Sequence, residues 1–240
     1  MTPASNIYLE RRPRLLREFD RGARLIQPVL AHYFPAEASE NLAIQARREY
    51  ADLIPQLPDL GGKEPFTRFL ISTAELLAVY RTVTARDLSL AQTGELVFEI
   101  GRAYLKAYPA YMTRWLGFMS FTPFYLNRLR KRAVESHERR YPDGYVFDYI
   151  PGDGATFDYG VDYLECGSCK FLARQGASEF APYICPSDIL YSKALGWGLV
   201  RTMTLAEGAP KCDFRFKRGG PTRVAVPESL RPVIEQYNTQ

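Results

Sequence analysis

Cysteine is absent from this 240-residue chain until Cys166. The four cysteines that the sequence has are Cys166, Cys169, Cys185 and Cys212. The start of the chain also lacks the apolar core of a signal peptide, so we do not expect secretion. Without secretion, thiols or metal ligands are expected rather than structural disulfides. We therefore expect a cytoplasmic protein whose sulfur chemistry is confined to its last third.

Long apolar runs are also missing. The nearest candidate, Tyr111–Leu126, is interrupted by Arg114 and Pro123, and no stretch approaches the roughly 18 apolar residues of a transmembrane helix. The chain carries 31 basic and 27 acidic residues, and a net charge of +4 is too small to indicate a nucleic-acid partner. We therefore expect no membrane span and no nucleic acid.

The usual catalytic signatures are missing as well. The sequence has no Walker loop, no GxGxxG and no HExxH. It has only two histidines, His32 and His137, and both are far from the cysteines in the sequence. If a base works together with the thiols, a carboxylate is the better candidate.

The part of the chain before Tyr141 carries the pattern of amphipathic helices. In the first of these, Leu15, Phe19, Ile26 and Leu30 recur at the three- and four-residue steps of one helix face. After Tyr141 the composition changes to aromatic and β-branched residues separated by Pro-Asp-Gly and Pro-Gly-Asp-Gly turns.

The second part is predicted to hold strands at 145–150 and 156–164 and short helices at 168–175 and 186–195. The segments GLVRTMTL and CDFRFK are predicted to form a hairpin. The fold class is therefore α+β, with an N-terminal helical half packed on a small C-terminal antiparallel sheet with two short helices. We expect either a helical region at 1–140 and an α+β region at 141–240, or one continuous domain.

A run of basic residues closes the helical half. It contains Arg128, Arg130, Lys131, Arg132, Arg139 and Arg140. Such a run is typical of a solvated helix face, with an anionic membrane surface or a partner as the alternative. The aromatic stretch 115–125 beside it is expected in the core or in a subunit interface rather than as a lipid anchor.

The cysteine spacing is C-x2-C-x15-C-x26-C. Structural zinc sites usually use two close pairs, and here only Cys166 and Cys169 are close. A site made of Cys166, Cys185, Cys212 and Asp188 with a divalent metal remains an alternative. A redox role for the close pair is weakly indicated, because no thioredoxin-like βαβ pattern surrounds it.

The positions of the cysteines are more informative than their spacing. Cys166 follows a strand where a helix should begin, and Cys185 precedes Pro186 at the predicted start of another. The positive end of a helix dipole lowers a thiol pKa below its usual value of about 8.5. Glu165 and Asp188 lie beside these thiols in the sequence and are candidates for acid–base work. The alternative is that the cysteines are inert core residues.

One ordered set of motifs in this part is similar to a known family. Cys166 precedes a helix that ends near a glycine, and Cys185 and Asp188 form a Cys-x-x-Asp pair. Arg-Thr-x-Thr at 201–204 and a Cys-Asp-Phe segment beginning at Cys212 follow in order. Together they resemble the L-2-amino-thiazoline-4-carboxylic acid hydrolase family over the segment 157–217. Cys169 is not part of that pattern.

The resemblance implies hydrolysis of a non-peptide carbon–nitrogen bond in a small cyclic amidine that bears a carboxylate. On this basis we place Cys185 and Cys212 at the reacting centre, Asp188 as acid or base, and Cys166 and Glu165 as further catalytic candidates. The candidates for substrate binding are Arg201, as a clamp for the carboxylate, and Thr202, Thr204 and Tyr183.

Other functions stay open at this point. The expected partner is a small-molecule substrate without a cofactor, and a homo-oligomer is not excluded. A metal-binding protein of the zinc type is one alternative, and a small-molecule sensor with structural cysteines is the other.

Overall fold

The computed structural model describes residues 7–61 and 66–238 of the chain. Its first part is helical, as the apolar periodicity predicts. The helices of this part are α1 (Ile7–Leu30), α2 (Ala36–Leu53), α3 (Thr67–Thr84), α4 (Leu90–Lys106), α5 (Ala110–Met119) and α6 (Pro123–Ser136). Pro123 at the first position of α6 separates it from α5, because proline suits a first helical turn but not a helix interior. None of the described helices has the length and apolar character needed to cross a membrane.

The second part combines a sheet with short helices. Its strands are β1 (Val146–Pro151), β2 (Tyr159–Glu165), β3 (Leu199–Arg201), β4 (Cys212–Phe216) and β5 (Arg223–Val224). Its helices are α7 (Gly167–Arg174), α8 (Ala181–Ile184), α9 (Ser187–Leu195) and α10 (Arg231–Asn238). Short 3-10 helices lie at Ile54–Gln56, Ser178–Phe180, Leu205–Glu207 and Glu228–Leu230. This arrangement confirms the α+β class and the predicted hairpin of β3 and β4.

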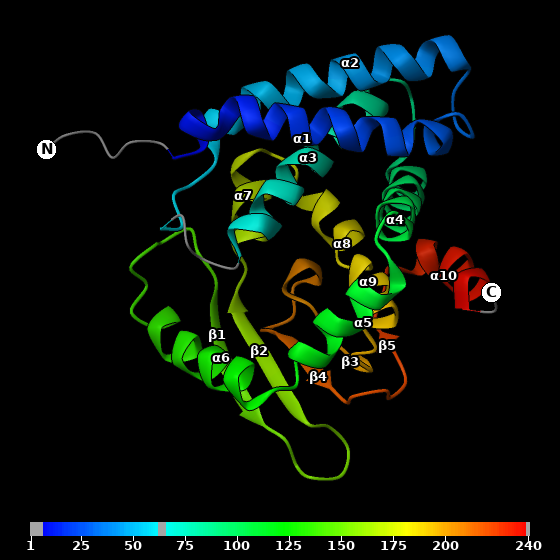
Figure 1. Cartoon of the computed structure of the whole chain (residues 1–240). Helices are drawn as coiled ribbons and strands as arrows, with labels where there is room; N and C mark the ends of the chain where they lie inside the picture. The colour runs from blue at the N-terminus through cyan, green and yellow to red at the C-terminus, as the bar shows by residue number, and fades with distance from the viewer. Residues whose placement is uncertain (1–6, 62–65, 239–240) are drawn as a thin grey trace, which may run out of the picture.

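The strands form one sheet in the order β1-β2-β4-β3-β5. Neighbouring strands are antiparallel except for β3 and β5, which run parallel, so the sheet is mixed rather than purely antiparallel. Because β4 lies between β2 and β3, the ends of β2 and β3 and the start of β4 come together, as Figure 1 shows. The end of β2 leads directly into α7, and α9 leads into β3.

The main hydrophobic core does not stop at residue 140. Phe171 and Leu172 of α7 and Phe180 are fully buried in the same cluster as Leu53, Leu77 and other side chains of α1 to α4. Conversely, Ala133 of α6 packs on the sheet with Phe147 and Phe216. In Figure 1, α6 lies against β1 and β2 while α7 lies beneath α3. This shared core favours one continuous domain.

A close approach of two helices holds α5 against α9. A Cβ atom built on Gly117 of α5 would lie 1.7 Å from the backbone oxygen of Leu195 at the end of α9. Only glycine leaves room for that contact, because the atom it meets is backbone and cannot rotate away. The position of α5 therefore depends on this residue.

The substitution Gly117→Ala tests that dependence. We expect it to lower the free energy of unfolding by about 2 kcal/mol, because α5 must move away from α9. Urea unfolding followed by circular dichroism measures the loss. The control is Gly101→Ala in α4, where the nearest atom is the flexible end of the Leu190 side chain at 2.8 Å. Equal losses in both variants would contradict the proposed role of Gly117.

Candidate active site

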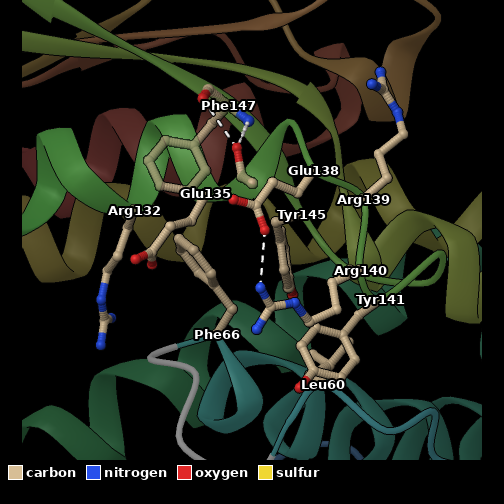
Figure 2. A pocket seen from close by; sticks show the side chains of 12 residues that line it. Leu60, Phe66, Arg132, Glu135, Glu138, Arg139, Arg140, Tyr141, Tyr145 and Phe147 are labelled. Atoms are coloured by element: carbon tan, nitrogen blue, oxygen red, sulfur yellow. Dashed lines mark hydrogen bonds and ion pairs between the residues drawn. The ribbon is translucent and has the colours of Figure 1, made fainter.

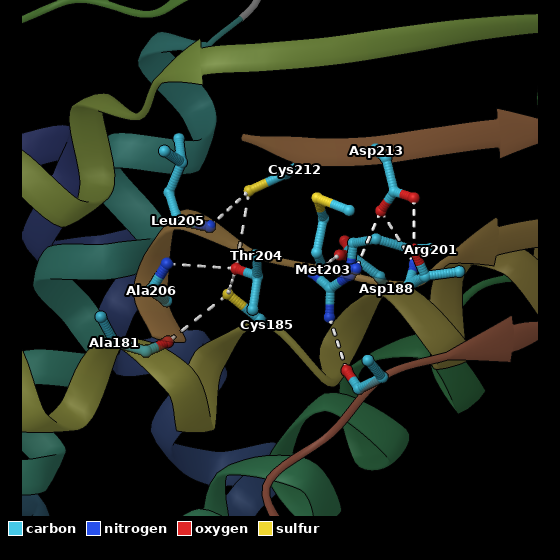
Figure 3. Close-up of polar contacts among 12 residues, drawn as sticks. Ala181, Cys185, Asp188, Arg201, Met203, Thr204, Leu205, Ala206, Cys212 and Asp213 are labelled. Atoms are coloured by element: carbon cyan, nitrogen blue, oxygen red, sulfur yellow. Dashed lines mark hydrogen bonds and ion pairs between the residues drawn. The ribbon is translucent and has the colours of Figure 1, made fainter. Parts of the chain in front are cut away.

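Two of the predicted cysteines meet at one hydroxyl group. Sγ of Cys185, which follows α8, lies 3.7 Å from Oγ1 of Thr204, and Sγ of Cys212 on β4 lies 3.5 Å from the same oxygen. Figure 3 shows the two sulfurs on either side of Thr204. Cys212 also accepts a hydrogen bond from the backbone N–H of Leu205 at 3.2 Å. The sequence motifs that contain these residues therefore converge in space.

Asp188 and Arg201 form the charged centre of the site. Asp188 lies in the first turn of α9, and its Oδ2 accepts a hydrogen bond from Nη1 of Arg201 at 2.9 Å. The Arg201 side chain is 1% exposed and the Asp188 side chain 29% exposed. Burial raises the pKa of Asp188, and the Arg201 charge opposes that rise without cancelling it. The carboxyl group therefore holds a proton to higher pH than a free aspartate does.

Arg201 is already hydrogen-bonded, through its guanidinium, to other groups of the protein. Besides Asp188 it donates to the backbone oxygen of Ala225 at 3.0 Å, and its guanidinium lies 5.6 Å from the ring centroid of Phe214. Its Nε is buried without a hydrogen-bond partner among the described residues. This geometry favours Arg201 as the residue that positions Asp188 rather than as a free clamp for a substrate carboxylate.

The threonines of the Arg-Thr-x-Thr segment shape the loop after β3. The Asp213 carboxylate accepts hydrogen bonds from the hydroxyl and backbone N–H of Thr202 and from the N–H of Met203, at 2.6 to 2.9 Å. Thr204 caps the 3-10 helix Leu205–Glu207 by accepting from the N–H of Ala206. Thr202 is exposed and bound to Asp213, so a substrate-binding role for it stays a prediction without support from this geometry.

Cys166 lies at the start of α7, as its position after a strand predicts. It is the N-cap residue, and its carbonyl oxygen accepts from the N–H of Lys170 at 3.0 Å. Cys169 is the third residue of the same helix, and the side chains of an N-cap residue and the third helical residue lie on one side of the first turn. All four cysteines are free thiols.

The four thiols differ in acidity. The pKa of Cys166 is lowered, first by a hydrogen bond from the Cys169 thiol and then by backbone N–H groups of the first turn of α7, against an opposing effect of burial. The pKa of Cys169 is correspondingly raised. Burial raises the pKa of Cys185 to about 12 and also raises that of Cys212. The hydrogen bonds to its sulfur therefore favour Cys166 as the thiol with the lowered pKa, whereas the family resemblance places Cys185 and Cys212 at the reacting centre.

A hydroxyl network supports the helix that carries Cys166. Oγ of Ser168 lies 2.8 Å from Oγ1 of Thr73 on α3 and 2.8 Å from the Tyr145 hydroxyl. Asp188 and Cys166 both influence the pKa of buried Tyr163, which is raised mainly by burial. The sequence did not identify Thr73, Tyr145, Tyr163 or Ser168 as site residues. Only the alternation that places Tyr163 and Val161 on one face of a strand could have indicated any of them.

Two further candidates lie outside this centre. Glu165 accepts from Nε of Arg139 at 2.9 Å and pairs with Lys170, and these cations lower its pKa. Tyr183 packs its ring against Gly94 and places its hydroxyl 3.3 Å from that of Ser229. Both side chains are engaged in structural contacts, and no contact among the described residues joins either one to Asp188.

A surface pocket lies beside the site rather than in it. Its volume is about 200 Å³, and Figure 2 shows side chains of α6 and of the segment leading into β1 around it. Its lining includes Phe66, Arg139, Arg140, Tyr141 and Tyr145. None of the predicted site residues is among the described residues that line this pocket. The pocket is connected to the helix that carries Cys166 through the hydrogen bond between Tyr145 and Ser168.

The metal alternative finds no matching geometry. Within residues 7–61 and 66–238, no three His, Cys, Asp or Glu side chains are grouped so that they could hold a metal ion. The described residues therefore give no support to the alternative set of Cys166, Cys185, Cys212 and Asp188, which stays a prediction.

The effect of Cys169 on Cys166 is testable without a substrate. In Cys169→Ala the thiol that donates to Cys166 is lost, so the pKa of Cys166 rises and less thiolate is present at a given pH. We expect the pH profile of Cys166 alkylation by iodoacetamide, followed by mass spectrometry, to shift to higher pH. Cys212→Ala is the control and should leave the profile in place. Identical profiles in the wild type and Cys169→Ala would contradict the assignment.

The buried ion pair predicts an asymmetric effect on stability. Arg201→Met leaves Asp188 without its cation and is expected to cost about 3 kcal/mol or more at neutral pH. The loss should shrink as pH falls, because the raised pKa of Asp188 lets the folded state take up the proton first. Arg201→Met/Asp188→Leu should recover most of the loss in urea unfolding. A double variant as unstable as the single one would contradict the pairing.

Comparison with known proteins agrees with the motif order. A family model described as L-2-amino-thiazoline-4-carboxylic acid hydrolase matches residues 68–216. The matched region is more than half of the chain, and it runs from α3 to the end of β4, so it contains Cys166, Asp188 and Arg201. No match was found among curated proteins or among solved structures. The chain belongs to the L-2-amino-thiazoline-4-carboxylic acid hydrolase family.

Proposed function

We propose that this protein hydrolyses the ring carbon–nitrogen bond of a small cyclic amidine carboxylate of the thiazoline type. In this proposal Cys166 is the nucleophile and Asp188 the general acid. The observation that carries it is that two groups that interact electrostatically have pKa values shifted in opposite directions, because the thiol pKa of Cys166 is lowered and the carboxyl pKa of Asp188 is raised. Titratable groups whose pKa values are pushed apart in this way are suited to acid and base roles at one site.

The first step would open the ring. C2 of a protonated 2-aminothiazoline is bonded to three heteroatoms and is electrophilic. The Cys166 thiolate would add to C2 and form a carbon–sulfur bond while the C=N electron pair moves to the ring nitrogen. The bond from C2 to that nitrogen would then break, and the protonated Asp188 would give its proton to the departing amine.

The second step would release the product. The Asp188 carboxylate would take a proton from water as the water oxygen attacks C2 of the covalent adduct. The Cys166 thiolate would leave with the electron pair of its bond, and the remaining hydroxyl proton would pass to the freed amine. The product carries a carbamoyl group on the former ring sulfur, and both residues return to their starting protonation states.

Arg201 and Thr204 would act by positioning. The hydrogen bond from Arg201 fixes the orientation of the Asp188 carboxyl group, and burial keeps its pKa raised despite that cation. Thr204 holds Cys185 and Cys212 in neutral contacts on the wall of the site. The raised pKa values of these two thiols support a lining role for them at neutral pH.

Turnover of 2-amino-thiazoline-4-carboxylate, with the carbamoyl product detected by mass spectrometry, tests the proposal. Cys166→Ser is expected to lower kcat at least about 1000-fold, because the nucleophile is lost. Asp188→Asn should also be slow and should accumulate an adduct on Cys166 after acid quenching. Cys212→Ser is the matched control and should stay within about tenfold of the wild type.

Two results would argue against different parts of the proposal. Full activity of Cys166→Ser would remove the thiol mechanism but leave the reaction class. A folded wild-type protein with no turnover of this substrate or of related cyclic amidines would remove the reaction class itself.

A further inference from the structure

Helix α5 buries small residues and exposes large aromatic ones, which is the reverse of a normal surface helix. Its buried side is made of Thr113 and Gly117, while Tyr111, Trp115 and Phe118 have 78%, 59% and 49% of their surface exposed. The Phe118 ring also faces the Arg218 guanidinium, 4.9 Å from the ring centroid. These three aromatic residues follow each other at steps of four and three residues, so they form one stripe on the helix. The sequence-based expectation for stretch 115–125 is the core or a subunit interface, and the exposure of Trp115 and Phe118 contradicts the core for these two residues.

The inner side of α5 explains why the aromatic rings face outward. Gly117 is needed where α5 meets the backbone oxygen of Leu195, and Ser120, just after α5, accepts a hydrogen bond from Nε1 of Trp197 at 3.2 Å. Large rings would not fit on this side. The aromatic stripe is thus left for something outside the fold, since large apolar residues gathered on a surface mark an interaction site.

Helix α6 follows α5 after a short turn and also exposes an aromatic side chain. Its inner side packs on the sheet through Leu126, Leu129 and Ala133. The opposite side carries Phe124, 72% exposed, together with the exposed cations Arg128 and Lys131. Phe124, Arg128 and Lys131 are four and three residues apart, so they share one face of the helix. We call the outer faces of α5 and α6 the α5–α6 face.

Basic residues predominate in this region, although α6 also contains Glu135, whose Oε1 lies 3.7 Å from Nζ of Lys131. Residues 100–134 contain seven basic residues and no aspartate or glutamate. The basic residues are Arg102, Lys106, Arg114, Arg128, Arg130, Lys131 and Arg132. In the whole chain the two signs nearly balance, so this stretch concentrates more positive charge than the entire protein carries in excess. Of these residues, Arg102 and Lys106 belong to α4, and Arg130 lies over the ring of Tyr149. The exposed cations Arg114, Arg128 and Lys131 remain for the α5–α6 face, and they favour an anionic partner that also accepts aromatic side chains.

We propose that the α5–α6 face docks on the surface of an anionic phospholipid bilayer. Tryptophan, tyrosine and phenylalanine rings enter the boundary between headgroups and acyl chains, while arginine and lysine bind the anionic headgroups. A second copy of the chain fits less well, because a two-fold contact through this face would bring the same cations together. The binding is peripheral and does not depend on the hydrolase activity.

Vesicle co-sedimentation of the full chain tests this proposal. We expect binding to phosphatidylcholine vesicles in which about a third of the lipid is phosphatidylserine, no binding to pure phosphatidylcholine, and weaker binding in about 0.5 M salt. The double variant Trp115→Ser/Phe124→Ser and the charge variant Arg114→Glu/Arg128→Glu should each bind at least about tenfold more weakly. All four side chains are exposed, and unchanged circular dichroism and thermal unfolding would show that the variants are folded.

Matched controls separate this face from general charge and apolarity. Arg21→Glu/Arg24→Glu on α1 changes the net charge by the same amount, and Ile44→Ser on α2 removes another exposed apolar side chain. Both controls should bind like the wild type. Three results would overturn the proposal: no binding of wild-type protein to anionic vesicles at low salt, equal binding of face and control variants, or a dimer in solution that Trp115→Ser/Phe124→Ser dissociates. Binding to single-stranded DNA that is as strong as vesicle binding and unaffected by loss of the aromatic residues would also overturn it.

Discussion

The buried guanidinium of Arg201 is the constraint around which the second half of the protein is arranged. It lies at the end of β3 and is bound on one side by Asp188 of α9 and on the other by the carbonyl of Ala225 after β5. A buried charge is very costly unless it is paired and hydrogen-bonded, so these three segments must come together in one way. Cys185 lies just before α9, and the same docking therefore carries its sulfur to Thr204.

This ion pair also determines which proton chemistry is available. Burial favours the neutral carboxyl of Asp188 and the Arg201 charge favours the carboxylate, and burial is the larger effect. The balance is opposite at Cys166, where hydrogen bonds to the sulfur outweigh burial. Hydrogen bonds to the sulfur at the N-cap position and burial of the carboxyl group thus shift the two pKa values in opposite directions, the pKa of Cys166 down and that of Asp188 up. Shifts in these directions suit the acid and nucleophile roles proposed for amidine ring opening.

The sequence predicted the elements of this site better than their partners. Strand alternation and the turn before Cys212 correctly predicted the β3–β4 hairpin, and the position of Cys166 after a strand correctly predicted the start of α7. Periodicity shows which side chains share a face of their own element, but it does not show what lies opposite. For that reason the sequence could not reveal that Arg201 donates a hydrogen bond to Asp188, or that Ser168 forms hydrogen bonds with both Thr73 and Tyr145.

Helix α5 shows a second limit of sequence patterns, because its aromatic residues suggested a core or a subunit interface, and the structure places Trp115 and Phe118 outside the core. Apolar periodicity identifies a buried face only when the partner surface has room for large side chains, and here the partner is the backbone of α9 at Leu195. The same tight contact connects the two proposals physically. A surface that binds the outer face of α5 is separated from Asp188 only by α5 and α9, and α9 is the helix whose first turn holds that carboxyl group. Gly117 meets α9 at Leu195, its last residue, whereas Asp188 lies in its first turn, so this contact joins α5 to the helix that carries the carboxyl group but at its other end.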